Sequence, residues 1–209
     1  MRALVTGGRG AIGSAICARL EDPLVLDLPE FDVSDPDAWA RVPGAFDGAF
    51  LNAGIGIGHS DIAELPEADY RRIVGTNLDG VVFGVRACAK RLMPNGGSIV
   101  ATASLAGLTP MPHDPAYTAT KHAVVGWVRA AAPALAARGI RLNAICPGFV
   151  DTPLVTEELR AQLDVPLLEP SFVAEAALRV LEDEETGRVW VVQPNRVEPF
   201  RFPGVPGPR

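Results

Sequence analysis

Short apolar runs alternate with segments of helical periodicity along most of the chain. The apolar runs predict buried strands at residues 2–6, 24–27, 46–51, 98–103, 140–146 and 189–192. The helical patterns predict helices at residues 12–20, 66–92 and 115–137, with shorter ones opening at Pro36 and at about 155–163 and 170–183. Strands and helices in alternation are joined by crossovers and pair in parallel. The pattern therefore predicts a single-domain α/β fold with a doubly wound, mostly parallel sheet.

Prolines and glycines modify this outline. Ser34 or Asp35 is positioned to cap the short helix that opens at Pro36. Pro133 removes one backbone hydrogen bond inside the helix at 115–137 and should kink or loosen it. Each glycine inside a helix costs about 1 kcal/mol against alanine. We therefore expect a packing or functional reason for the three in the long helix at 66–92, which are Gly75, Gly80 and Gly84.

The last part of the chain differs in composition from the rest. Prolines recur in it at short intervals, at positions 194, 199, 203, 206 and 208. Proline cannot donate a backbone hydrogen bond, so the sequence predicts no regular structure there. We divide the chain into a domain of residues 1–193 and a Pro-rich tail of residues 194–209.

Charge and composition exclude several classes of protein. The 209 residues carry a net charge of −6 and show no basic stripe, which argues against nucleic acid as a partner. No apolar run is long enough to span a membrane, and an apolar strand begins almost at Met1, so we expect neither a membrane segment nor a signal peptide. Cys17, Cys88 and Cys146 lack metal-ligand spacing and are interpreted as buried thiols, so we expect no metal and a cytoplasmic protein.

Residues 6–13 read T-G-G-R-G-A-I-G and directly follow the first predicted strand. A helix and a second strand come next, and the second strand ends on Asp27. This order is typical of dinucleotide-binding folds, because glycines let the backbone approach a pyrophosphate and the acidic side chain accepts ribose hydroxyls. The glycine pattern alone also fits a tight turn before any helix. Together with the flanking strands and Asp27, it favours a dinucleotide site.

The segment from Ser104 to Lys121 carries the candidate chemistry. Tyr117 and Lys121 stand four residues apart in a predicted helix and therefore share one face. A free phenol titrates near ~10, too high for efficient proton transfer at neutral pH. A fixed ammonium beside it, with a hydroxyl from Ser104 at a strand end, would lower that pKa. The alternative is an ordinary solvated contact between Tyr and Lys on a helix face.

These motifs, with others in the same order, resemble the short-chain dehydrogenase/reductase family from Ala3 to about Gln193. The matching segments are Thr6-Gly7…Gly13, Asp27, Asp32-Val33, Asn52-Ala53-Gly54, Asn77, Ser104, Tyr117-x-x-x-Lys121 and Pro147-Gly148-x-Val150-x-Thr152. The resemblance implies a Rossmann fold and a nicotinamide cofactor. It also implies a homodimer or homotetramer, in which the helices carrying Asn77 and Tyr117 often pair across subunits.

The resemblance assigns roles to particular residues. Tyr117 would be the general acid and base, Ser104 would bind the substrate oxygen, and Asn77 would join a proton relay behind Lys121. The catalytic set is therefore Asn77, Ser104, Tyr117 and Lys121. The residues expected to bind the cofactor are Gly7, Arg9, Ala11, Ile12, Gly13, Asp27, Asp32, Val33, Asn52, Ala53, Gly54, Tyr117, Lys121, Pro147, Gly148, Val150 and Thr152.

Three departures from the family pattern concern the cofactor end. Ala11 replaces the second glycine of the turn, with Gly10 one place earlier. Arg9 would favour the 2′-phosphate of NADP, whereas Asp27 repels it, and we predict NAD. Only four residues separate Asp27 from Asp32, too few for the usual crossover helix. We therefore predict that this helix is deleted and that the third strand is missing or a stub, leaving the second strand at or near the sheet edge.

The predicted function is hydride transfer between NAD(H) and a small, fairly apolar secondary alcohol or ketone. The alternative is a nucleotide-binding or redox-sensing relative with little turnover. Sugar epimerase and dehydratase relatives need a larger substrate domain, and the enoyl reductase branch spaces its tyrosine and lysine further apart. Two loop histidines, His59 and His113, are within reach of a substrate but are more often passive at such positions.

Overall fold

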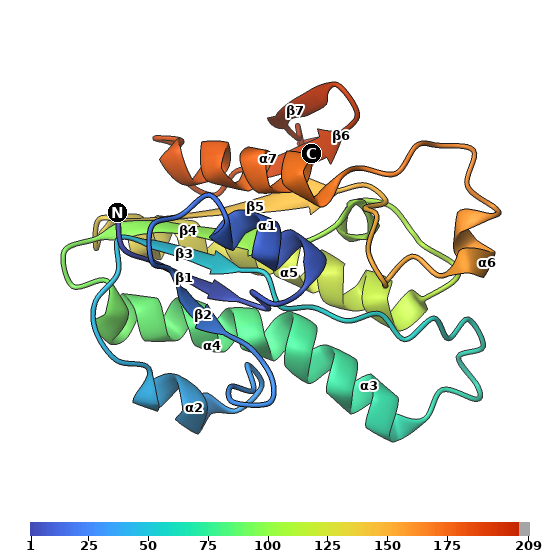
Figure 1. Ribbon diagram of the computed structural model, residues 1–209, viewed down its shortest axis with the longest axis horizontal. Helices are drawn as coiled ribbons and strands as arrows, with labels where there is room; N and C mark the ends of the chain where they lie inside the picture. The colour runs from blue at the N-terminus through green and yellow to red at the C-terminus, as the bar shows by residue number, and fades with distance from the viewer. Residues whose placement is uncertain (205–209) are drawn as a thin grey trace, which may run out of the picture.

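The protein is built on one seven-stranded sheet with the order β2-β1-β3-β4-β5-β6-β7 (Figure 1). The computed structural model describes residues 1–204. Six strands pair in parallel, and the last is antiparallel to its neighbour. The strands are β1 (Ala3–Thr6), β2 (Leu24–Leu26), β3 (Gly48–Leu51), β4 (Gly97–Thr102), β5 (Ile140–Pro147), β6 (Val189–Gln193) and β7 (Arg196–Pro199). The predicted α/β fold is confirmed.

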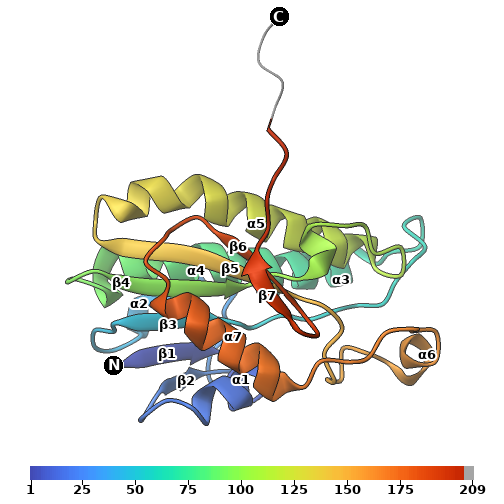
Figure 2. The ribbon, with the colours of Figure 1, turned by 90° about the horizontal axis from the view of Figure 1, so that it is seen from above.

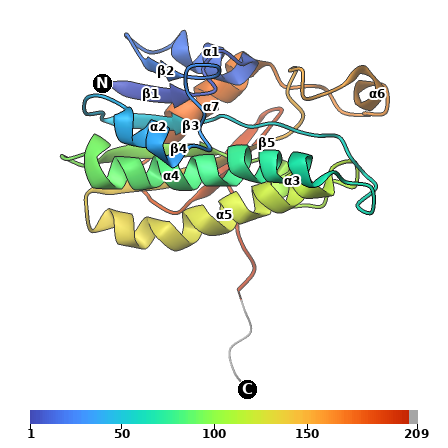
Figure 3. The same ribbon diagram turned by 90° about the horizontal axis from the view of Figure 1, so that it is seen from below.

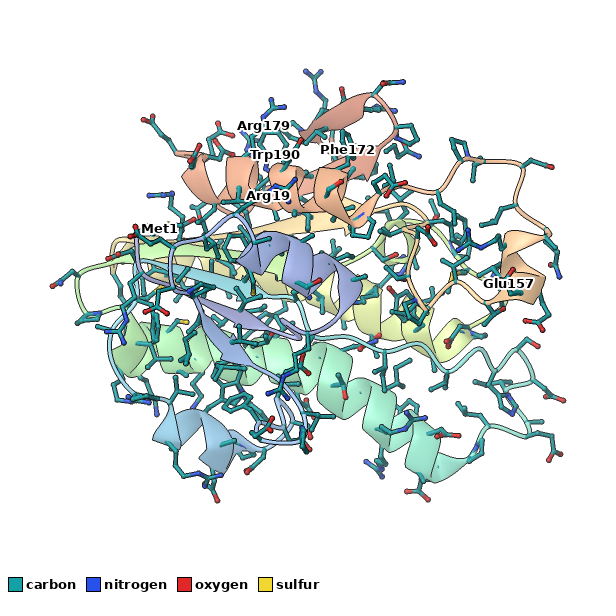
Figure 4. All side chains as sticks on the ribbon, viewed as in Figure 1. Met1, Arg19, Glu157, Phe172, Arg179 and Trp190 are labelled. Atoms are coloured by element: carbon teal, nitrogen blue, oxygen red, sulfur yellow. The ribbon has the colours of Figure 1, made fainter. Side chains whose placement is uncertain are left out.

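Helices cover both faces of the sheet (Figures 2 and 3). One face carries α1 (Ala11–Cys17) and α7 (Pro170–Glu182), and the other carries α2 (Pro36–Arg41), α4 (Gly80–Ala87) and α5 (Pro115–Ala136). The core accordingly has two layers. Val85, Val124 and Leu142 belong to the layer under α4 and α5, and Ile16 and Val173 belong to the layer under α1 and α7. In that second layer Arg179 of α7 lies 5.5 Å from the ring centroid of Trp190 (Figure 4).

β2 is an edge strand, as the short spacing between Asp27 and Asp32 predicts. It pairs only with β1, and Val25 in its middle is 39% exposed. A loop without helix or strand connects it to α2. The side chain of Asp35 accepts a hydrogen bond from the Asp37 amide at 2.8 Å and so caps α2, as the sequence predicts.

The long helical segment from Glu67 to Leu92 consists of α3 (Glu67–Val74), a π-helical turn (Gly75–Asp79), α4 and a second π-helical turn (Cys88–Leu92). Close packing explains two of its glycines. A Cβ at Gly80 would lie 2.7 Å from a methyl carbon of Val33, and one at Gly84 would lie 2.6 Å from Leu51. Such distances are too short for nonbonded carbon atoms. Gly84 lets the helix lie directly against β3, and Gly80 lets it lie against the loop that carries Val33.

The prediction for the tail is wrong for part of its length. Residues Arg196–Pro199 form β7, which pairs with β6 through a two-residue turn at Pro194 and Asn195. The residues between the prolines alternate in exposure, which suits an edge strand, and Pro199 falls at its end. Beyond it, the guanidinium of Arg129 on α5 lies 3.7 Å from the Phe202 ring centroid. The part of the tail at residues 205–209 lies outside the described residues.

Two further features bear on the predictions. Pro133 lies inside α5, and the helix continues past it to Ala136. The predicted helix at about 155–163 is shorter, with α6 spanning Glu157–Arg160. Between residues 1 and 204, none of the helices combines the length and the apolar character needed to cross a bilayer.

Candidate active site

The predicted functional residues gather at the carboxyl ends of the parallel strands. Thr6, Leu51 and Ala101 are aligned in neighbouring strands, and Thr102 is aligned with Ile145. The loops that follow these strands therefore emerge side by side at one edge of the sheet. In doubly wound sheets this edge is where ligands bind.

The glycine turn after β1 is closely packed. Gly7 has a φ of +64°, and its carbonyl accepts a hydrogen bond from the Gly10 amide at 3.1 Å. A Cβ at Gly13 would lie 2.0 Å from that carbonyl oxygen, so only glycine fits there. The missing side chains let the turn pack tightly against Ala53 and the start of α1, as the glycines of a pyrophosphate-binding turn do. Ala11 and Ile12 begin α1 directly after it.

Asp27 and Arg9 lie together, but Arg9 is held by other groups. The Asp27 carboxylate accepts hydrogen bonds from the Arg9 and Leu28 amides, both at 2.8 Å. The Arg9 guanidinium donates to the Leu28 carbonyl at 2.7 Å and to Glu30 at 2.6 Å. The hydrogen bond from Arg9 lowers the pKa of the Glu30 carboxyl. Glu30 carries no sequence signal of this role, because an exposed carboxylate in a loop belongs to no recognisable pattern.

A cavity of about 180 Å³ lies beside Asp27. Its lining brings together predicted cofactor residues from three loops, and Thr76 closes it from the helical side. The predicted residues in the lining are Gly7, Asp27, Asp32, Val33, Ala53 and Gly54. This cavity is where the adenosine half of a dinucleotide is expected.

Asn52 joins three strands at the end of β3. Its side-chain nitrogen donates to the Thr6 carbonyl at 3.4 Å, and its oxygen accepts from the Thr102 hydroxyl at 3.2 Å. The Thr6 hydroxyl in turn accepts from the Asn52 and Ala53 amides at 2.9 and 3.1 Å. Thr6 and Thr102 therefore hold the Asn52-Ala53-Gly54 turn in place. The sequence analysis gave Thr102 no role at this site.

Asn77 is fully buried in the first π-helical turn. Its oxygen accepts from the Ile55 amide at 2.8 Å, and its nitrogen donates to the Ile55 carbonyl at 2.9 Å and to the Thr120 hydroxyl at 3.2 Å. A Cβ at Gly54 would lie 3.3 Å from the Lys121 ammonium and 3.4 Å from the Asn77 oxygen. The Asn77 oxygen and the Lys121 ammonium therefore both lie beside Gly54. The part of Asn77 in a proton relay stays a prediction.

Lys121 and Tyr117 stack on the inner face of α5. The Lys121 ammonium is buried, donates to the Thr102 carbonyl at 2.8 Å and lies 5.4 Å from the Tyr117 ring centroid. Burial lowers the pKa of Lys121 to about 8. The ammonium faces the ring of Tyr117 rather than water, so the two side chains form one unit instead of a solvated surface pair.

The expectation that this pairing lowers the phenol pKa is wrong for the protein alone. Burial raises the pKa of Tyr117 to about 12, the neighbouring Ser104 hydroxyl opposes that rise, and the negative charge of Asp114 adds to it. Sequence spacing shows which groups are neighbours but not how much water they lose. The Ser104 hydroxyl also accepts from the Ala106 amide at 3.1 Å, which fixes the turn after β4.

The loop after β5 closes the site on the other side. The Gly148 amide donates to the Val192 carbonyl at 2.9 Å, and a Cβ at Gly148 would touch Leu105 at 3.6 Å. Val150 is buried and pairs with Leu168, while the Thr152 carbonyl accepts from the Val155 amide at 3.0 Å. The loop therefore passes the turn that carries Ser104 at Gly148.

Asp114 is a site residue that sequence reasoning missed. It is 2% exposed, caps α5 by accepting from the Tyr117 amide at 2.9 Å, and also accepts from the Ile57 and Gly58 amides, both at 2.8 Å. The Asp114-Pro115 pair was an available signal for the helix cap. His113 is exposed, and the His59 Nδ1 atom is buried without a hydrogen-bond partner. The described residues contain no group of His, Cys, Asp or Glu placed to hold a metal ion.

The comparisons with known proteins agree with this geometry. The family model described as enoyl-(acyl carrier protein) reductase matches residues 16–191. A putative short-chain type dehydrogenase/reductase of Mycolicibacterium smegmatis is 40% identical over 67% of this chain and 53% of its own length. A cyclohexanol dehydrogenase of Acinetobacter sp. is 34% identical over 89% of this chain and 74% of its own length.

A 3-oxoacyl-[acyl-carrier protein] reductase from Brucella melitensis, crystallised with bound NAD, superposes with a TM-score of 0.80 at 30% identity. The superposition covers 91% of this chain and 88% of that one. The chain spans only 53% and 59% of the first two curated relatives that it matches. The shared fold, the matched length and the identities show that the chain belongs to the short-chain dehydrogenase/reductase family.

Proposed function

We propose that this protein is an oxidoreductase that transfers a hydride between NAD(H) and a small, fairly apolar secondary alcohol or ketone. The observation that carries the proposal is the cluster of Tyr117, Lys121 and Ser104. Gly54 connects this cluster to the cavity next to Asp27, because Gly54 lines the cavity and a Cβ on it would lie 3.3 Å from the Lys121 ammonium. The cluster combines a proton donor, a buried ammonium and a hydroxyl at the edge of the sheet where a dinucleotide fits. The cyclohexanol dehydrogenase relative supports an alcohol as the substrate class.

The residues present fit a dinucleotide. At Gly7 a Cβ would strike the Ala53 backbone at 2.8 Å, and at Gly13 it would strike the Gly7 carbonyl at 2.0 Å. These glycines let the turn fold tightly just before α1, where the pyrophosphate would bind. Asp27 would bind the adenosine ribose, and Lys121 the nicotinamide ribose. Pro147, Gly148, Val150 and Thr152 would hold the carboxamide. The nicotinamide, when bound, supplies the chemistry of hydride donation and acceptance.

The chain's own residues would move the proton. In ketone reduction the Tyr117 hydroxyl donates its proton to the carbonyl oxygen, while Ser104 donates a hydrogen bond to the same oxygen and stabilises its developing charge. In alcohol oxidation the Tyr117 phenolate takes the hydroxyl proton. Because burial raises the pKa of Tyr117 to about 12, oxidation depends on positive charge nearby to favour the phenolate. Lys121 supplies one such charge, and the oxidised cofactor supplies the other.

We propose NAD rather than NADP. A carboxylate at Asp27 binds ribose hydroxyls and repels a 2′-phosphate. Arg9, the one nearby cation expected to favour NADP, is paired with Glu30 at 2.6 Å. The Brucella melitensis reductase with bound NAD supports the assignment. Steady-state kinetics should give a higher kcat/KM with NAD than with NADP, and the reverse order would refute it.

The test of the activity is a panel of secondary alcohols and ketones followed by NADH absorbance. Tyr117→Phe removes the phenolic oxygen and leaves the ring. We expect kcat to fall by about 10³-fold or more, or roughly 4 kcal/mol, with calorimetric NAD binding unchanged. Tyr70→Phe is the matched control, because Tyr70 is the chain's other tyrosine and is 44% exposed on α3. Equal rates for the wild type and Tyr117→Phe would contradict the mechanism.

A second candidate function is a nucleotide-binding or redox-sensing protein with little turnover. The observation that favours it is the exposed position of β2, which leaves the adenosine side open at the sheet edge. Calorimetric NAD binding without turnover on the whole panel, unaltered in Tyr117→Phe, would support this candidate.

We further propose that the protein works as a homodimer or homotetramer in the cytoplasm, with no nucleic acid or membrane partner. The acidic net charge of −6 supports the exclusion of nucleic acid. Sedimentation velocity of the purified protein tests the assembly, and a monomer at micromolar concentration would refute it.

A further inference from the structure

One buried carboxylate connects the catalytic helix to the loop that follows β3. Asp114 is 2% exposed. One of its oxygens accepts from the Tyr117 amide at 2.9 Å, and the other accepts from the Ile57 and Gly58 amides at 2.8 Å each. Ile57 and Gly58 precede Asp114 by 57 and 56 residues, whereas Tyr117 follows it by three. The two segments therefore share a single acceptor group.

These hydrogen bonds compensate for the burial of the charge. Among residues 1–204, no ion pair includes Asp114. Taking a carboxylate out of water is costly unless hydrogen bonds replace its hydration, and bonds to a charged acceptor are stronger than neutral ones. Three backbone amides donate hydrogen bonds to the Asp114 carboxylate, and two of them belong to the loop. The buried charge is therefore stabilised only while the loop keeps its position. Release of the loop would leave the charge short of partners.

This carboxylate lies where the loop after β3 meets the segment after β5. A Cβ at Gly56 would lie 3.4 Å from Leu154 and 3.6 Å from the Asp114 carboxylate. Leu154 belongs to the segment after β5, so this loop, that segment and α5 meet here. Asn77 holds the same loop two residues earlier, through the amide and carbonyl of Ile55. The loop is thus anchored at Ile55 by Asn77 and at Ile57 and Gly58 by Asp114.

We propose that Asp114 is a positioning residue that holds the loop at residues 55–58 against the N-terminus of α5 and so sets the substrate cleft around Tyr117. It acts through backbone amides and does not itself contact the reacting atoms. This inference rests on the proposed dehydrogenase function. It adds a residue that the family's catalytic set, as carried over to this chain, does not include.

The charge of Asp114 provides a second signature. Four groups face the Tyr117 phenol. They are Ser104 after β4, Cys146 in β5, Asp114 at the N-cap of α5 and Lys121 within α5. The negative charge of Asp114 disfavours the phenolate. A neutral residue at this position should therefore move the rising limb of the pH profile for alcohol oxidation to lower pH. A residue with only a folding role would leave that limb in place.

Two substitutions separate the functions of Asp114. Asp114→Ser keeps a side-chain oxygen that can cap α5, but the serine side chain is too short for this oxygen to reach the loop at residues 55–58. Asp114→Asn keeps the size but offers one acceptor oxygen, so it cannot serve both segments. Asp47→Asn is the control, because Asp47 also accepts a long-range backbone bond, from the Arg2 amide at 2.9 Å, but precedes β3 at the opposite end of the sheet.

For both Asp114 variants we expect kcat/KM for the alcohol or ketone to fall about tenfold or more, mainly through KM. NAD affinity should stay within about twofold of the wild type. Asp47→Asn should keep the wild-type kcat/KM. Values for the Asp114 variants equal to those of Asp47→Asn, or a loss of NAD binding that parallels the loss of turnover, would overturn the proposal.

Amide hydrogen exchange of the full chain tests the contact independently of turnover. Ile57 and Gly58 should be protected in the wild type and in Asp47→Asn, and should exchange at least tenfold faster in Asp114→Ser. Unchanged protection would overturn the proposal whether or not the protein is an enzyme. If the wild type turns over no substrate, the proposed function fails while exchange still decides the contact. If exchange increases but kcat/KM does not change, the positioning role alone fails.

Discussion

Lys121→Met is expected to stabilise the native protein most at neutral pH while abolishing turnover. The Lys121 ammonium is buried and has one recorded acceptor, the Thr102 carbonyl at 2.8 Å. Burial lowers its pKa from 10.5 to about 8. The unfolded chain therefore holds this proton more tightly than the native protein does. Folding at neutral pH must keep a charge in a site that disfavours it.

The size of this effect follows from linkage. Each pKa unit corresponds to about 1.4 kcal/mol, so the buried ammonium costs the native state roughly 3 kcal/mol near pH 7. A group with a depressed native pKa gives the unfolded state more bound protons between the two pKa values, so stability rises with pH across that window. The free energy of unfolding of the wild type should therefore gain roughly 2–3 kcal/mol on that of Lys121→Met between about pH 7 and pH 10.

Denaturant unfolding followed by tryptophan fluorescence at several pH values measures this difference. The lost hydrogen bond to Thr102 shifts the whole curve and leaves its pH slope unchanged. Tyr117 adds little to the difference below about pH 10, because burial raises its pKa in the native protein to about 12 and an unfolded tyrosine titrates near ~10. Lys90→Met is the control, because Lys90 is the chain's other lysine and is exposed. Parallel curves of unfolding free energy against pH for the wild type and Lys121→Met would show that burial does not destabilise the Lys121 ammonium and would refute the reasoning.

Three further outcomes are expected. Gly13→Ala puts a Cβ 2.0 Å from a turn carbonyl and should abolish calorimetric NAD binding in a folded protein. Gly84→Ala should cost about 1–3 kcal/mol in denaturant unfolding by overpacking, whereas Gly126→Ala, in an exposed and open stretch of α5, should gain up to about 1 kcal/mol. Glu30→Gln should raise the ratio of NADP to NAD kcat/KM by releasing Arg9, and an unchanged ratio would contradict that role.

Local patterns were sufficient for much of the fold and of the site. Periodicity predicted six of the strands, and the i,i+4 spacing put Tyr117 and Lys121 on one face of α5, as the structure shows. The short interval after Asp27 predicted that β2 lies at an edge. Each of these depends on residues that are close in sequence. Helical and strand periodicities report such neighbours directly.

Features that depend on distant residues could not be predicted. The bond from the Gly58 amide to Asp114 spans 56 residues, and the one from Lys121 to the Thr102 carbonyl depends on how β4 meets α5. The pKa of Tyr117 has the same origin, because burial is a property of the assembled fold. The proline content of the tail does not predict β7. A proline at the end of an edge strand, as Pro199 is, breaks no sheet hydrogen bond.

The buried polar groups show where this chain gives up stability. Among the described residues, most of the buried polar and charged side chains lie at the candidate site, namely Thr6, Asn77, Thr102, Asp114, Thr120 and Lys121. Each replaces apolar packing with a group that needs a partner, and Lys121 keeps its charge at a cost. A fold selected only for stability would place apolar side chains there. Their concentration at one edge of the sheet is therefore a physical argument for function that does not depend on family resemblance.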